Sequence, residues 1–177
     1  MSWLGTWRSA RERRRRAAAY LDRALAPSDP AERQWLGALT GDPRLADREL
    51  AFAVRAVALI VAERDALDDR TASDVASALV PLLDAEARRS AAERAAWVAR
   101  WRGYSAAMSV RGHADAPAVR LARVLLDGAG VSRPAADSVD RAAEVVVRAR
   151  GRANEALRAT FGEASLPDDI RPSALRS

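Results

Sequence analysis

Apolar residues recur every three or four positions through most of the chain, which is the spacing of an amphipathic α-helix. The one cluster of β-branched residues, Val145 to Val147, lies inside such a helical pattern. Seven helices are predicted, over residues 2–26, 30–40, 43–66, 73–88, 90–111, 116–127 and 133–161. The pattern therefore predicts an all-α, single-domain helical bundle.

Capping residues and prolines mark the predicted helix ends. Asp29 and Asp42 each precede a proline and are expected to cap the second and third helices. The same pattern, a capping residue followed by proline in the first turn, predicts helix starts at Asp115-Ala116-Pro117 and Ser132-Arg133-Pro134. Capping-box spacing predicts further starts at Thr71 and Ser90. Helix stops are expected at Gly41, Gly112, Gly128 and Gly162. Pro81 should kink the fourth helix or begin the next one, and Gly103 and Gly151 interrupt the fifth and seventh.

The third predicted helix is apolar nearly all round, which favours a central, buried position. Connections between helices are short, so neighbouring helices should be antiparallel or sharply angled. Residues 163–177 contain two prolines and no periodicity. The expected organisation is a basic amphipathic helix over 1–26, a bundle body over 27–162 and an irregular tail over 163–177.

The net charge of +5 lies at one end of the chain. Every basic residue is arginine, and residues 1–26 hold seven of the 29 against two acids. Residues 27–177 contain the remaining 22 arginines and an equal number of acids, so this part of the chain is neutral overall. The body is predicted to have an ordinary mixed surface, and the first helix a cationic one.

A helical projection of residues 1–26 separates apolar from basic side chains. One face holds Trp3, Trp7, Ala10, Ala17, Ala18, Leu21, Ala24 and Leu25. The sides and back hold Arg8, Arg11, Arg15, Arg16 and Arg23, and Arg14 alone intrudes into the apolar stripe.

Three interpretations of this helix remain open. The apolar stripe could dock on the body, with Arg14 reaching to the edge. It could instead lie in the interface of an anionic membrane, where tryptophan and arginine are both favoured. The arginines could also contact nucleic-acid phosphates, although base-reading groups are missing from that face. The candidate partner-binding or polyanion-binding residues are Trp3, Trp7, Arg8, Arg11, Arg13, Arg14, Arg15 and Arg16.

A second aromatic stripe lies on the predicted fifth helix. Trp97, Trp101, Tyr104 and Met108 recur at helical spacing, which is typical of core residues. The alternative is a partner groove, with Arg100 at its edge.

Signals for catalysis or cofactor binding are weak. The chain lacks cysteine and has one histidine, His113, so common zinc and di-iron sites cannot be completed. The acidic string of Asp65, Asp68, Asp69 and Asp74 fits a helix–loop–helix junction better than a magnesium site. A loose helix-turn-helix likeness, with a recognition helix from Arg133, has poor base-reading residues. Neither a cofactor nor a metal is expected.

The pattern as a whole favours a non-enzymatic interaction protein, an adaptor or a small subunit, that contacts a protein partner through its basic helix. A nucleic-acid-associated accessory subunit and a peripheral membrane-surface protein are the alternatives. The longest apolar run, residues 50–62, is too short to span a membrane. We therefore expect a cytoplasmic protein. A location at the membrane surface is the alternative.

Overall fold

The computed structural model describes residues 3–65, 69–87, 90–109 and 114–162, and for residues 3–8, 69, 86 and 87 the backbone alone. All regular elements in these ranges are α-helices. They are α1 (Trp3–Ala24), α2 (Pro30–Thr40), α3 (Pro43–Arg64), α4 (Asp69–Ala87), α5 (Ala91–Ser109), α6 (Pro117–Gly128) and α7 (Ala136–Phe161). The predicted all-α bundle is confirmed.

The starts of α2 and α3 are capped as the sequence predicts. Asp29 accepts a hydrogen bond from the Ala31 amide at 2.7 Å, and the Glu32 carboxylate accepts one from the Asp29 amide. Asp42 accepts hydrogen bonds from the amides of the next helix's first turn. Between them Gly41 ends α2 with φ of +70°, a backbone conformation that favours glycine.

Two predicted helix starts are wrong, and one predicted cap is not formed. α4 begins at Asp69, so Thr71 lies inside the helix, where its side chain is buried against neighbours instead of capping. α6 begins at Pro117, as predicted, but Ala116 precedes it without a side-chain cap, and the carboxylate of Asp115 pairs with Arg123 at 3.3 Å. α7 begins after Ala135, so Arg133, restricted by the proline that follows it, lies in the connection.

The ends and interior of the remaining helices follow the prediction more closely. The Glu93 amide donates a hydrogen bond to the Ser90 hydroxyl at 3.3 Å, as a cap should. α4 continues through Pro81, so of the two predicted alternatives the start of a new helix there is wrong. α5 and α7 continue through Gly103 and Gly151. Gly112 lies outside the described residues.

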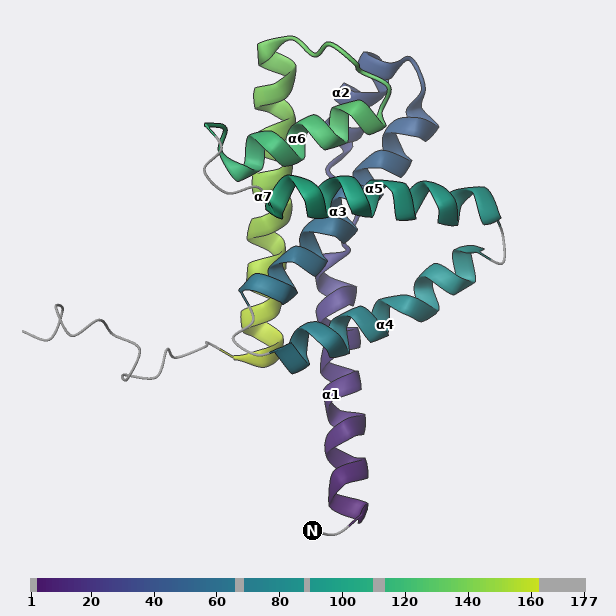
Figure 1. Ribbon diagram of the computed structural model, residues 1–177, viewed down its shortest axis with the longest axis vertical. Helices are drawn as coiled ribbons and strands as arrows, with labels where there is room; N and C mark the ends of the chain where they lie inside the picture. Colours follow the sequence, from purple (N-terminus) through teal and green to yellow (C-terminus); the bar gives the residue numbers. More distant parts are fainter. Residues whose placement is uncertain (1–2, 66–68, 88–89, 110–113, 163–177) are drawn as a thin grey trace, which may run out of the picture.

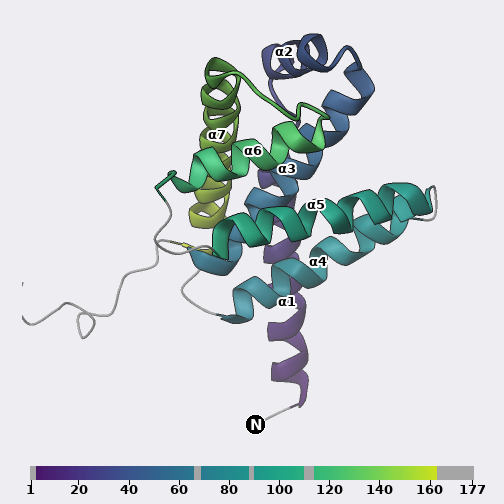
Figure 2. The same cartoon turned by 45° about the horizontal axis from the view of Figure 1, so that its top comes forward.

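The centre of the molecule is α3, as predicted. Twelve of its 22 residues are buried, and it packs against each of the other six helices. α1 and α7 run along the long axis of the molecule, while α5 and α6 cross them (Figure 1). Turning the molecule shows α4 and α5 together on one side of α3 (Figure 2). The first turns of α1 extend beyond the end of this bundle (Figure 1).

Candidate functional site

The C-terminal half of α1 is part of the core. Ala17, Tyr20, Leu21 and Ala24 are all buried, against α4 and α7. The Tyr20 hydroxyl donates a hydrogen bond of 2.7 Å to the carbonyl oxygen of Ala58 in the central helix. Burial, with a smaller effect of the Asp65 charge, raises the pKa of Tyr20 far above its ordinary value. These contacts fix the direction in which α1 leaves the body.

The buried face of α1 differs from the predicted stripe. Ala18 is exposed, and Tyr20, which the stripe did not include, is buried. Arg14 is also exposed, whereas Arg13 lies at the edge of the interface and pairs with Asp74 of α4 at 3.2 Å. The prediction is confirmed at Ala17, Leu21 and Ala24, which are buried, and wrong at Ala18, because the face that packs on the body includes Tyr20 instead.

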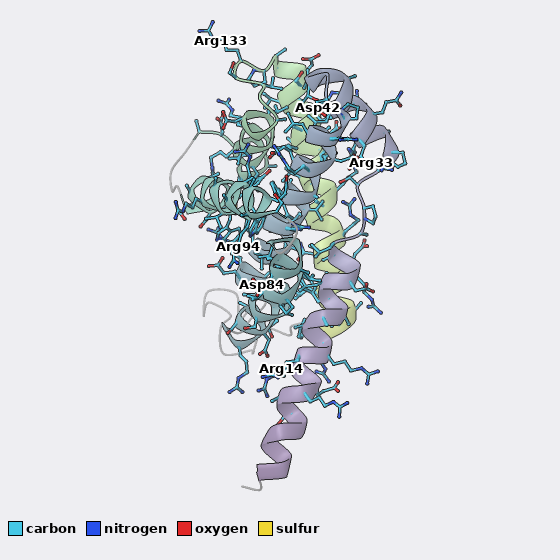
Figure 3. The ribbon with its side chains drawn as sticks, turned by 90° about the vertical axis from the view of Figure 1, so that its right-hand side faces the viewer. Arg14, Arg33, Asp42, Asp84, Arg94 and Arg133 are labelled. Atoms are coloured by element: carbon cyan, nitrogen blue, oxygen red, sulfur yellow. The ribbon has the colours of Figure 1, made fainter. Side chains whose placement is uncertain are left out.

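The arginines before this interface form an exposed basic surface. We call residues 3–16 the basic arm. Arg11, Arg14, Arg15 and Arg16 are exposed, and Arg16 pairs with Glu12 one turn away at 3.3 Å. Arg14 and Arg15 form no ion pair with any residue in the described ranges. Figure 3 shows Arg14 on the part of α1 that leads away from the other helices. The side chains of Trp3, Trp7 and Arg8 lie outside the described residues.

The predicted aromatic stripe on α5 is core at its centre and open at one edge. Trp97 is buried against Phe52, with ring centroids 5.7 Å apart, and Trp101 is half-buried and stacks on Trp97 at 6.1 Å. The two indoles line a groove of about 460 Å³ between α3, α4 and α5, which we call the tryptophan groove. Its other walls include Leu59, Glu63, Ala76 and Leu83.

Two residues of the predicted groove lie elsewhere. The Arg100 guanidinium turns to α3 and α6, where its Nε donates to the Glu49 carboxylate at 2.7 Å and an Nη donates to the Gly128 carbonyl at 2.8 Å. Tyr104 is fully buried, and burial raises the pKa of its hydroxyl. That hydroxyl has no hydrogen-bond partner among the described residues. The assignment of Arg100 and Tyr104 to the groove is therefore corrected.

Sequence reasoning missed two buried carboxylates. Glu49 is fully buried and receives hydrogen bonds from Arg48 and Arg100. Glu32 is 4% exposed and accepts a hydrogen bond of 2.8 Å from Arg148, which raises the pKa of that guanidinium. The available signal was their position, since both acids fall on the core-facing side of an apolar helix pattern.

The acidic string between α3 and α4 is divided among separate partners. Asp65 follows the end of α3 and pairs with Arg150 at 3.3 Å, while Asp74 pairs with Arg13. Within the described ranges, no three His, Cys, Asp or Glu side chains gather in a way that could hold a metal ion. Asp68, the side chain of Asp69, and His113 lie outside those ranges.

Comparison with known proteins adds no functional assignment. No family model matches the sequence, and neither a curated protein nor a solved structure matches it at a significant level. Among the helices that the structure describes, none combines the length and the apolar character needed to cross a membrane.

Proposed function

We propose that this protein is a non-enzymatic interaction protein, an adaptor or small subunit, that holds an acidic protein partner through its basic arm. The observation that carries the proposal is that one helix is half core and half exposed cationic surface. Ala17, Tyr20, Leu21 and Ala24 are 0–3% exposed, while Arg14 and Arg15, on the turn before them, are exposed.

The anchored half of α1 favours binding by the exposed half. A preorganised helix loses less conformational entropy on binding than a flexible basic tail would. The Tyr20 hydrogen bond and the Arg13–Asp74 pair hold the arm at a fixed angle to the body. Its arginines therefore reach a partner from a defined direction. On binding, the main conformational entropy still to be lost is that of the arginine side chains.

The composition of the arm favours protein over the alternative partners. Trp3, Trp7 and the arginines belong to the residue types that dominate binding energy at protein interfaces. Nucleic-acid binding would use the same arginines on phosphates, but the arginine side of the arm offers no aromatic group for base stacking. Membrane binding would instead depend mainly on the two tryptophans.

A charge-reversal experiment with a matched control tests the proposal. In one variant Arg14→Glu and Arg15→Glu reverse two exposed charges of the arm. In the control, Arg33→Glu and Arg133→Glu make the same change in net charge at two exposed residues near the other end of the molecule (Figure 3). Each full-length protein is used to isolate complexes from extract of the source cells, and each partner is then titrated as a purified protein.

The expected result is a stoichiometric complex with the wild type and the control. The arm variant should bind the purified partner at least about tenfold more weakly, and rising salt should weaken the wild-type complex. Complexes that disappear after nuclease treatment would support the nucleic-acid alternative. Binding to anionic vesicles that requires Trp3 and Trp7 would support the membrane alternative. Either of these outcomes, or equal binding by the arm variant, would overturn the proposal.

A further inference from the structure

The tryptophan groove is separate from the basic arm and has the size of a small-molecule site. Its volume of about 460 Å³ falls inside the range of roughly 300–1,000 Å³ typical of ligand pockets. Most of its walls are apolar, from α3, α4 and α5, with the side chains of Leu59, Ala76 and Leu83 among them. A ligand seated there would therefore need a substantial apolar body.

Two stacked indoles form the aromatic wall of the groove. Trp97 and Trp101 stack with an interplanar angle of 28°, and Trp101 keeps part of its surface exposed. The face of an indole carries negative electrostatic potential and attracts cations lying within about 6 Å of it. No arginine is among the described residues that line the groove, so this attraction is not satisfied from within.

The groove also contains one carboxylate without a partner. Glu63 is the only ionisable residue in the described lining, and it is exposed. It makes no ion pair or hydrogen bond through its side chain with the residues that the structure describes. Other exposed acids, such as Asp22 and Asp47, are also unpaired within the described ranges, so what distinguishes Glu63 is its position in the groove lining. A single unpaired negative charge beside stacked indoles is complementary to a single positive charge.

We propose that the tryptophan groove binds a small organic cation with an apolar body, such as an aryl phosphonium or alkyl ammonium compound. The apolar body would cover Leu59, Ala76 and Leu83, while the positive charge would lie between the indoles and Glu63. The residues that line the groove belong to residues 27–177, which are neutral overall. This site does not depend on the function proposed for the arm.

Isothermal titration calorimetry with tetraphenylphosphonium tests the proposal on the full-length chain. Its anionic counterpart of the same shape, tetraphenylborate, serves as the matched probe. Ala76→Trp should fill the groove from an exposed position on α4, and Glu63→Gln removes the charge without changing the side-chain volume. Glu155→Gln, an exposed acid of α7 outside the groove, controls for the change in net charge. Sedimentation velocity records the oligomeric state of each protein.

The expected result is saturable one-to-one binding of tetraphenylphosphonium that Ala76→Trp abolishes. Glu63→Gln should weaken it about tenfold, equal to about 1.4 kcal/mol, and Glu155→Gln should leave it unchanged. Tetraphenylborate binding, if present, should persist in the Ala76→Trp protein, because it would occur at the arginines.

Several outcomes would overturn the proposal. One is failure of tetraphenylphosphonium to bind. Another is equal affinity of the wild type and Glu63→Gln for this cation, because the groove would then select its ligand by shape and not by charge. A third is a wild-type dimer that Ala76→Trp dissociates, because the groove would then belong to a second copy of the chain. None of these results bears on the arm, whose variants are tested separately.

Discussion

The two tyrosines of this protein are both buried, but their hydroxyl groups are in opposite situations. The Tyr20 hydroxyl donates to the Ala58 carbonyl at 2.7 Å, whereas the Tyr104 hydroxyl has no partner among the described residues. Removing a satisfied buried hydroxyl loses a hydrogen bond and leaves an acceptor unpaired. Removing an unsatisfied one relieves a desolvation cost.

We therefore expect opposite effects from the same chemical change. Tyr20→Phe should lower the free energy of unfolding by about 1 kcal/mol, and Tyr104→Phe should leave it unchanged or raise it by up to about 1 kcal/mol. Urea unfolding of the two variants, followed by far-UV circular dichroism, gives both values. A destabilised Tyr104→Phe protein would show that this hydroxyl has a partner, such as a bound water, in solution.

Single residues are also where prediction from sequence is weakest. The arginine run was visible, but the pairing of Arg13 with Asp74 depends on where α4 lies, and the sequence does not give that position. Glu49 and Arg100 are 51 positions apart and meet only because α3 and α5 pack together. The spacing around Arg100 pointed to the Trp97 and Trp101 groove, since a helical projection cannot tell which neighbour a long side chain reaches.

At the scale of helices, glycine positions differ in what surrounds them. At Gly128, the last residue of α6, an added Cβ would lie 2.5 Å from both Arg100 Nε and Glu49 Oε2. At Gly151, inside α7 and exposed, an added Cβ would meet nothing within 4 Å. Alanine is the better helix former at both sites, so any loss of stability must come from contacts.

We expect Gly151→Ala to raise the free energy of unfolding by about 0.5–1 kcal/mol. Gly128→Ala should lower it by about 1–3 kcal/mol, because the methyl group separates the Glu49 carboxylate from Arg100 or strains the helix. The midpoints of urea unfolding, measured for both variants and the wild type, give these changes in free energy if the m-value is the same for all three proteins. Repeating Gly128→Ala in an Arg100→Met background should show a smaller additional cost, and a strictly additive cost would argue against the contact with Arg100.

Helix positions could be predicted well where the signal is local. The starts of α2 and α3 depend on an aspartate that hydrogen-bonds to its own helix, so sequence alone is sufficient. The start of α4 was misplaced and the predicted Asp115 cap of α6 is not formed, because other contacts compete with local capping. Thr71 is buried by packing, and Asp115 is drawn to Arg123.

At the scale of the whole molecule, the central place of α3 could be predicted because a helix that is apolar nearly all round is stable only when other helices cover it. The order of the helices around α3 could not be predicted from the sequence. α1 and α7 lie side by side although they are the first and last helices, and no periodicity within either helix encodes that contact. The boundary between buried and exposed parts of α1 comes from this arrangement.

That boundary predicts how the fold responds to shortening from the N-terminus. Among the described residues of α1, those buried begin at Ala17, so a chain starting at Arg11 keeps all of them. We expect its thermal midpoint to stay within about 2 °C of the full chain, since roughly 1 kcal/mol corresponds to 2–4 °C at this size. A chain starting at Pro27 also loses Tyr20 and Leu21, and its midpoint should fall by about 10 °C or more.

Differential scanning calorimetry of the full chain and the two shortened chains measures these midpoints. A fall of several degrees in the chain starting at Arg11 would mean that Trp3 and Trp7 pack on the body, as the docked interpretation of the helix requires. An unchanged midpoint would leave both indoles available to a partner. The same chain would then separate the two contributions to partner binding, because it lacks the tryptophans and Arg8 but keeps Arg14 and Arg15.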